Sequence, residues 1–270
     1  MRWSLQLLVL AMVAACGDPV AAPPPPVPAP APITKSESAP ATPAPPLEEA
    51  PAPAGPVPKL LVRGFGSGSS GLVEKMRSFD TFKELLEKEG FDASNHAHDL
   101  GDYDDGKPLA DMASEVATKI EAVMAGYPAG TKFDVLGHSL GGIVLLHAVL
   151  DHGLAPRVRT FVALSSPIYG QDDKPLNCKV GFRCSDVYAM YSPYRSDQVV
   201  DYMTKSSAAL SGMKRCSLIS PDDGIIDAPM AGGQFPDGAN VVVADVSHIA
   251  IIRSAEAVAA LKTECFDGAF

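Results

Sequence analysis

The sequence contains no cluster of basic residues, and its charge is strongly unbalanced. It carries 32 Asp and Glu residues against 22 Lys and Arg residues, which gives a formal net charge of −10 at pH 7. An acidic surface repels nucleic acid and anionic lipid headgroups. We therefore expect no nucleic-acid partner and no electrostatic docking to a membrane.

The sequence also lacks a hydrophobic run long enough to cross a bilayer comfortably. Its apolar stretch from Leu5 to Ala15 follows Arg2 and is shorter than the roughly 20 residues that a transmembrane helix needs. A basic start, a short apolar run and small residues before Cys16 are typical of a secretory signal peptide. We expect residues 1–15 to be removed and the protein to be exported.

The residues around the expected cleavage site favour a lipid anchor. Val13-Ala14-Ala15-Cys16 resembles the lipobox of bacterial lipoprotein precursors, which implies that Cys16 is diacylated and becomes the first mature residue. Gly17 follows the cysteine, and by the same resemblance this favours the outer membrane or the cell surface. The alternative is an ordinary signal peptide with a cysteine nearby. The expectation is a lipoprotein held on a membrane by its N-terminal anchor.

Aromatic residues are absent from residues 19–58, which hold 16 of the 25 prolines. Proline fixes φ and removes a backbone donor, and without aromatic side chains there is no core to bury. We expect residues 16–58 to be a disordered, extended tether that holds a folded domain off the membrane. A ligand for a proline-binding module is the alternative. Residues 59–270 are long enough for one domain with a sizeable core.

Cysteine is scarce, and its spacing contains no CxxC pair that would suggest a zinc site. Beyond Cys16 there are four cysteines, an even number that indicates disulfides in an exported protein. Of the three possible pairings, we expect Cys178–Cys184, which closes a short loop, and Cys216–Cys265, which ties a late strand to the last helix. No metal and no cofactor is expected.

Strand and helix patterns alternate along residues 59–270. Apolar, β-prone runs predict strands at 59–63, 92–98, 132–136, 158–164, 217–220 and 240–245, and helical spacing predicts helices at 79–89, 108–124, 140–151, 195–210 and 249–265. This alternation is typical of an α/β fold, with a mostly parallel sheet covered by helices on both faces. Sites in such folds form at the carboxyl ends of the strands.

A Gly-x-Ser-x-Gly pentapeptide, Gly137–Gly141, lies between a predicted strand and a predicted helix. That context indicates a nucleophile elbow, which aims the hydroxyl of Ser139 at a cleft. Glycine suits both ends of the pentapeptide because Cβ atoms there would collide with neighbouring backbone. The N–H of Leu140 lies at a helix N-terminus, where it can stabilise the oxyanion of a tetrahedral intermediate.

A serine nucleophile needs a base and an acid that orients that base. Of six histidines, His248 follows an apolar run and precedes a helix, which places it at the carboxyl end of a strand. Three carboxylates compete for the role of the acid, Asp222, Asp223 and Asp227, in a stretch that is also strong turn chemistry. The residues alone do not choose among them.

These motifs together resemble bacterial lipases and esterases of the α/β-hydrolase fold, among them the small lipases of Gram-positive bacteria. The likeness rests on Gly137–Gly141, Val62–Gly66, Asp223–Ile226 and Val246–Ile249, and it spans most of residues 59–270. The resemblance implies a carboxylic ester hydrolase, acting on a lipid or a small ester through an acyl-enzyme intermediate. The chain is expected to act as a monomer.

The resemblance also assigns roles within the site. It selects Asp223 as the acid beside Ser139 and His248, and it maps the oxyanion hole to the backbone N–H groups of Phe65 and Leu140. The family usually has His-Gly where this chain has Arg63-Gly64. We expect Arg63 to pair with a nearby Asp as a structural bridge rather than to take part in the chemistry.

The segment from 166 to 194 is long and irregular, and it follows the strand after the elbow helix. Such a loop borders the cleft, so we expect either a cap over the substrate pocket or an elaborated surface excursion. Two other functions use the same residues. An acyltransferase would pass the acyl group to another acceptor, and a non-catalytic surface lipoprotein would keep the scaffold alone.

Overall fold

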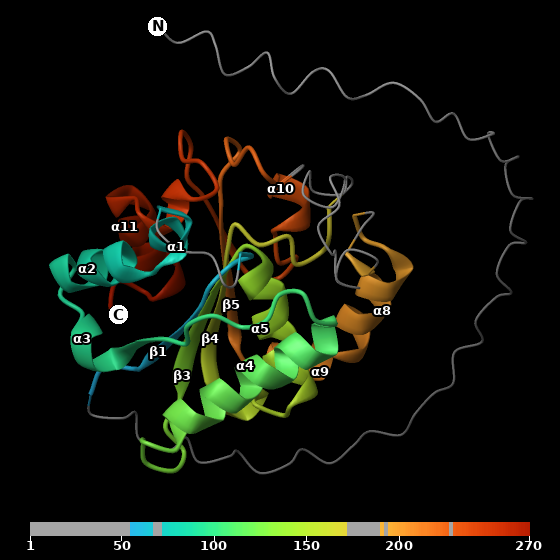
Figure 1. Ribbon diagram of the computed structural model, residues 1–270, viewed down its shortest axis with the longest axis horizontal. Helices are drawn as coiled ribbons and strands as arrows, with labels where there is room; N and C mark the ends of the chain where they lie inside the picture. The colour runs from blue at the N-terminus through green and yellow to red at the C-terminus, as the bar shows by residue number, and fades with distance from the viewer. Residues whose placement is uncertain (1–54, 67–71, 172–189, 192–193, 227–228) are drawn as a thin grey trace, which may run out of the picture. The chain divides into compact units, whose positions relative to one another are not determined.

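The computed structural model describes residues 55–66, 72–171, 190–191, 194–226 and 229–270 (Figure 1). Within these residues, six strands form one sheet in the order β2-β1-β3-β4-β5-β6, and all neighbouring strands are parallel. The strands are β1 (Lys59–Val62), β2 (Ala97–Asp99), β3 (Phe133–His138), β4 (Val158–Leu164), β5 (Lys214–Ile219) and β6 (Ala239–Val242). The predicted α/β class with a mostly parallel sheet is confirmed.

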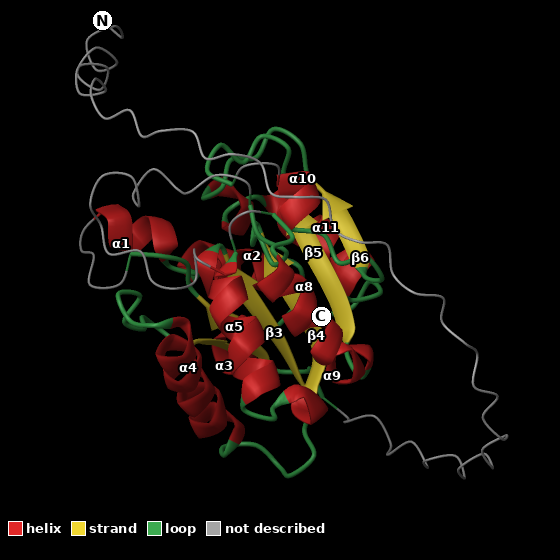
Figure 2. Ribbon diagram, turned by 90° about the vertical axis from the view of Figure 1, so that its right-hand side faces the viewer, coloured by secondary structure: helices red, strands yellow, loops and turns green. Residues whose placement is uncertain are grey.

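Helices cover both faces of the sheet (Figures 1 and 2). The α-helices are α1 (Leu72–Arg77), α2 (Asp80–Lys88), α3 (Ala93–His96), α4 (Leu109–Met124), α5 (Leu140–Asp151), α8 (Asp197–Lys205), α9 (Ser207–Ser211), α10 (Pro229–Gly232) and α11 (Ala255–Cys265). Two 3-10 turns are η1 (Ala155–Arg157) and η2 (Ala250–Ile252).

Successive strand residues point into two different hydrophobic cores, as the pleat of a sheet requires. Leu60 and Val62 of β1 belong to the core that α4, α5, α8 and α9 cover, whereas Leu61 belongs to the core under α2 and α11. Helix α5 is buried from Leu140 to Val149. Packing therefore holds the start of α5, and with it the turn that leads into this helix.

A buried ion pair lies at the end of the sheet where strands β1 and β3 begin. Lys59 Nζ lies 2.9 Å from a carboxylate oxygen of Asp134, and both side chains are fully buried. Arg159 approaches the same carboxylate at 2.6 Å, and the rings of Phe91 and Phe266 have centroids 4.3 and 4.5 Å from Nζ. These contacts fix β1 beside β3 at the edge opposite the carboxyl ends of the strands.

Three predicted elements are replaced or divided in the structure. Most of the strand predicted at 92–98 is helix α3, because the Asp92 side chain accepts a hydrogen bond from the N–H of Asn95 and begins a helix there. The helix predicted at 249–265 is divided by Ser254, which caps α11. The helix predicted at 195–210 is divided at Ser206.

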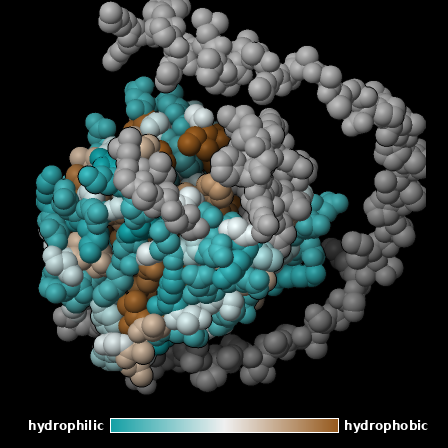
Figure 3. Space-filling view, viewed as in Figure 1, coloured by the Kyte–Doolittle hydropathy of each residue, from teal (hydrophilic) through white to brown (hydrophobic). Residues whose placement is uncertain are grey.

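The described surface is mostly hydrophilic on the face seen in Figure 3, and its apolar atoms lie in a few patches. The large hydrophobic residues that are exposed are Met76, Val200, Ile225 and Val242. No helix in the described ranges is long and apolar enough to cross a membrane. The predicted signal peptide and nearly all of the predicted tether lie outside the described residues.

Candidate active site

The carboxyl ends of the central strands bring the predicted site residues to one edge of the sheet. Ser139 lies between β3 and α5, with φ 56° and ψ −132°. A residue other than glycine rarely has a positive φ, and such backbone strain persists only where the surrounding structure imposes it. Here the N–H of Ser139 donates to the carbonyl of Leu164 at the end of β4, over 2.9 Å. The turn between strand and helix is therefore tied to the neighbouring strand.

Glycines allow this turn to pack against the loop after β1. A Cβ on Gly141 would lie 2.1 Å from the carbonyl oxygen of Arg63, and one on Gly137 would lie 2.5 Å from the Cα of Gly142. A Cβ on Gly64 would lie 2.9 Å from the Cβ of Ser139. The predicted reason for the glycines of the pentapeptide, close packing against backbone, is confirmed.

His248 and Asp223 form a buried hydrogen-bonded pair. Nδ1 of His248 lies 2.9 Å from Oδ2 of Asp223, and both side chains are almost fully buried. Burial opposes the charge of Asp223, but hydrogen bonds from the imidazole and from the N–H groups of Ile225 and Ile226 outweigh it and hold its pKa below the ordinary value. An ionised Asp223 accepts a hydrogen bond from Nδ1–H of His248, which leaves Nε2 of the neutral ring free to accept a proton.

Of the three carboxylates left open by the sequence, the structure describes Asp222 and Asp223, and of these two Asp223 lies beside His248. Asp222 is exposed and accepts a hydrogen bond from the N–H of Asp245 over 2.8 Å. Asp227 lies outside the described residues. The structure therefore brings together Asp223 and His248 at the ends of β5 and β6.

His138 contacts both the backbone and the ring of His248. Its Nε2 lies 2.9 Å from the carbonyl oxygen of His248, and the two rings have centroids 4.8 Å apart. Because a carbonyl oxygen can only accept a hydrogen bond, Nε2 of His138 carries the ring proton and donates the hydrogen bond. Burial, reinforced by the neighbouring His248, lowers the pKa of His138 to about 3. His138 is therefore a neutral hydrogen-bond donor that fixes the backbone of His248.

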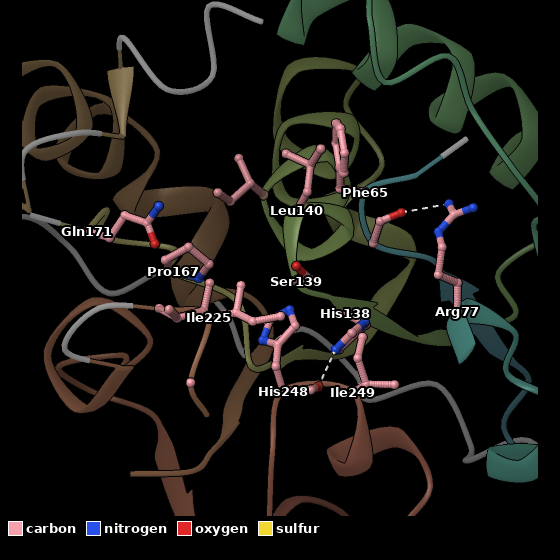
Figure 4. Close-up of a pocket in the computed structure, with 14 residues that line it drawn as sticks. Phe65, Arg77, His138, Ser139, Leu140, Pro167, Gln171, Ile225, His248 and Ile249 are labelled. Atoms are coloured by element: carbon pink, nitrogen blue, oxygen red, sulfur yellow. Dashed lines mark hydrogen bonds between the residues drawn. The ribbon is translucent and has the colours of Figure 1, made fainter. Parts of the chain in front are cut away.

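A cavity of about 510 Å³ opens above these residues (Figure 4). Figure 4 shows the imidazole of His248 pointing toward the hydroxyl of Ser139. Most of the lining side chains are apolar: Phe65, Leu140, Ile143, Pro167, Ile225, Ile226 and Ile249. Both residues predicted to supply the oxyanion hole, Phe65 and Leu140, line the cavity beside Ser139. The arrangement suits a largely apolar substrate whose reacting group lies at Ser139.

Arg77 lines the same cavity and was missed by the sequence analysis. Its Nη2 donates to the carbonyl oxygen of Gly64 over 2.8 Å, and its Nη1 donates to the carbonyl oxygen of Gly66. These two carbonyls flank Phe65, so one guanidinium holds the backbone on both sides of it. Asp102 lies 3.1 Å from Nη2 and balances the charge. A six-residue helix such as α1 gives little signal in sequence, and its spacing of Glu74 and Arg77 is that of an ordinary surface pair.

Arg63 forms the structural bridge that the sequence predicted. Its Nε and Nη2 lie 3.0 and 2.8 Å from the carboxylate of Asp99, and Nη1 lies 2.5 Å from Glu74. Arg63 is not among the residues that line the cavity. The residue that replaces the family's histidine therefore ties β1 to β2 and α1, and this prediction is confirmed.

The cysteines and the predicted cap lie partly outside the described residues. Cys216 of β5 and Cys265 of α11 are joined by a disulfide. Cys178 and Cys184 lie outside the described residues, as do residues 172–189 of the predicted cap. Among the described residues, no group of three His, Cys, Asp or Glu side chains is placed to hold a metal ion.

Comparison with known proteins shows the family to which the chain belongs. The sequence profile of the palmitoyl protein thioesterase family matches residues 58–208, which is more than half of the chain. This match ends before Asp223 and His248. No curated protein is similar enough in sequence to count as a match.

Several solved structures share the fold. The mature form of lipase BlEst2 from Bacillus licheniformis is similar with a TM-score of 0.56 and 20% identity, over 76% of this chain and 89% of that one. Its propeptide form has a TM-score of 0.55 and 19% identity, over 76% and 49%. Lipase B of Aspergillus fumigatus has a TM-score of 0.50 and 15% identity, over 73% and 49%. At these identities the likeness is one of fold, and the α/β-hydrolase fold is confirmed.

Proposed function

Because the chain belongs to the palmitoyl protein thioesterase family and is an ester-hydrolysing enzyme, we propose that Ser139, His248 and Asp223 form its catalytic triad. The observation that carries this proposal is the buried pair of His248 and Asp223, 2.9 Å apart, beside Ser139 at the strained turn after β3. The sequence predicts carboxylic ester substrates, and the family supports extending the proposed substrates to thioesters.

The chemistry follows from the protons that the site can move. Ser139 Oγ attacks the carbonyl carbon while its proton passes to Nε2 of His248. The N–H groups of Phe65 and Leu140 donate to the oxyanion, and Asp223 stabilises the imidazolium. His248 then gives its proton to the departing thiol or alcohol, which leaves an acyl-enzyme. A water molecule, deprotonated by His248, releases the acid and restores Ser139.

A fluorophosphonate probe tests the proposed nucleophile, because it labels only an activated serine. We expect the purified protein to be labelled and the Ser139→Ala variant to be unlabelled, with Ser165→Ala as the control. Ser165 also has positive φ, at 44°, and is buried at the end of β4, but it is not among the residues that line the cavity. Labelling that persists in Ser139→Ala would overturn the proposal.

A matched pair of substrates tests the ester class. Oxygen esters and thioesters of the same acyl group, assayed over a range of chain lengths, show which leaving group the site favours. The apolar lining of the cavity supports a preference for an apolar acyl chain over acetyl. Equal rates on acetyl and longer esters would contradict that part of the proposal.

We also propose that the catalytic domain, residues 59–270, is exported and held on the outer membrane or the cell surface through a diacylated Cys16. The composition of residues 1–15 and the proline-rich residues 16–58 support this. Incorporation of an alkyne-labelled fatty acid should be lost in Cys16→Ser. A Cys16→Ser variant that still carries the label would overturn the anchor.

A further inference from the structure

One polar side chain in the wall of the cavity has no role in the proposed chemistry. Gln171 lines the cavity opposite Arg77 (Figure 4), and it is 4% exposed. The carbonyl oxygen of its terminal amide is buried and has no hydrogen-bond partner among the described residues. Buried polar atoms are almost always paired, since an unpaired one loses its hydration without compensation. This exception lies at the substrate cavity rather than in the core.

The backbone around Gln171 is held firmly. Its N–H donates to the carbonyl of Tyr191 over 2.9 Å, and the hydroxyl of Tyr191 lies 3.0 Å from Nε2 of His147 on α5. Just before it, the N–H of Gly170 donates to the carbonyl of Pro167 over 2.8 Å. Gln171 is thus connected to the helix that begins at the nucleophile. A side chain on so fixed a backbone can position a substrate group relative to Ser139.

The chemistry of a primary amide limits what it can bind. Its oxygen accepts and its nitrogen donates two hydrogen bonds, and a turn about the last torsion exchanges the two ends. A substrate amide matches this pattern, because it offers one donor and one acceptor. A purely hydrocarbon substrate leaves the Gln171 amide unpaired and is disfavoured for that reason.

We propose that Gln171 is a specificity-determining residue that hydrogen-bonds an amide group of the substrate. The inference rests on the proposed function, because it is read through hydrolysis at Ser139. It adds to that function a polar requirement inside a largely apolar cavity. The amide belongs either to the acyl part or to the leaving part of the substrate, and the experiment separates the two.

Two pairs of thioesters test the inference. The first pair has one acyl group on either N-acetylcysteamine or pentanethiol, which have similar lengths and differ in the amide. The second pair has one thiol on either an N-acylglycine or a fatty acid of equal length. The readout is the ratio of kcat/KM for the amide-bearing ester to that for its hydrocarbon analogue, measured by thiol release.

We expect one pair to show a ratio above one in the unaltered protein. Gln171→Met keeps the length of the side chain and removes its hydrogen bonds, so it should lower that ratio about three- to tenfold, mainly through KM. Ile143→Val, which changes an apolar residue of the same cavity, should affect both esters of a pair equally. Gln171→Leu, which also removes the hydrogen bonds, serves in place of Gln171→Met if the latter does not fold.

The outcomes separate this inference from the function on which it rests. Hydrolysis of all four thioesters with ratios that Gln171→Met leaves unchanged overturns the role of Gln171 and leaves the hydrolase intact. Such a result would mean that water alone satisfies the amide. Hydrolysis of none of them, together with no labelling of Ser139, overturns the proposed function and the inference with it.

Discussion

His248 is joined to Asp223 twice, once through its side chain and once through its backbone. Nδ1 of the imidazole lies 2.9 Å from the carboxylate, and the N–H of His248 donates to the carbonyl of Asp223, also over 2.9 Å. The second bond fixes the loop after β6 against the loop after β5. The first then sets the ring's tautomer as well as its orientation.

Asp223→Asn should therefore damage catalysis far more than it damages folding. An asparagine donates through its amide nitrogen or accepts through its oxygen, and it cannot stabilise an imidazolium. We expect kcat/KM to fall by about 10⁴-fold. Asp222→Asn is the matched control, because that exposed carboxylate accepts from the N–H of Asp245 and should change activity by less than about threefold. A larger loss at Asp222 would show that the acid is wrongly assigned.

Arg77 should act on the rate rather than on substrate binding. Its guanidinium donates to the carbonyls on both sides of Phe65, and an ammonium lacks the fork that makes both bonds at once. We expect Arg77→Lys to lower kcat about ten- to hundredfold with little change in KM, because in the proposed mechanism a displaced Phe65 N–H would no longer donate to the oxyanion.

Arg253→Ala is the control for Arg77. Arg253 donates to the carbonyl of Lys75 in α1 over 2.8 Å, so it also holds that helix, but this hydrogen bond does not go to Gly64 or Gly66. If both variants lower kcat equally, the effect comes from the position of α1 and not from the contacts to Gly64 and Gly66.

The sequence predicts those parts of the site that depend on the succession of neighbouring residues along the chain. The elbow at Ser139 follows from a strand, a glycine-flanked serine and a helix, and His248 follows from an apolar run that precedes a helix. The pairing of Arg63 with an aspartate was also predicted. Its partner Asp99 was not, because β2 begins only at Ala97, after a helix that Asp92 caps.

The missed residues depend on contacts between distant segments. Arg77 meets Gly64 only because α1 turns back over the loop after β1, and a helix of six residues has no clear periodicity. Gln171 lies in an irregular segment, and its lack of a partner is visible only once the cavity is built. No pattern in the sequence distinguishes either residue from a surface polar side chain.

His138 should make the protein less stable in acid. Its pKa is about 3 in the folded protein and near the ordinary 6.5 in the unfolded chain, so between these values the unfolded chain binds one more proton. Stability therefore falls as pH drops from about 6.5 to 3, with a slope of up to about 1.4 kcal/mol per pH unit from this group.

His138→Gln tests this assignment, because glutamine also donates to the carbonyl of His248 but does not titrate. Urea unfolding between pH 4 and pH 7 should show a shallower pH dependence in the variant, by about one proton. In both proteins, stability also falls at lower pH as Asp223 becomes protonated. The pKa of this carboxylate is lowered in the folded protein, so it stabilises the fold only while it is ionised. Parallel curves for the two proteins would contradict a neutral, buried His138.

The disulfide between Cys216 and Cys265 should stabilise the domain by restricting the unfolded chain. It joins residues 49 apart in sequence, and closing a loop of that length removes entropy worth about 4 kcal/mol from the unfolded state. Both cysteines are fully buried between β5 and α11, so the double variant Cys216→Ala, Cys265→Ala also loses some packing.

Reduction of the unaltered protein separates the two effects, because it breaks the bond and keeps the sulfur atoms. We expect the reductant to lower the unfolding temperature of the unaltered protein by more than it lowers that of the double variant, which can keep only the predicted Cys178–Cys184 bond. The variant Cys178→Ser, Cys184→Ser should still respond to the reductant; if it does not, the stabilising bond involves the other pair of cysteines.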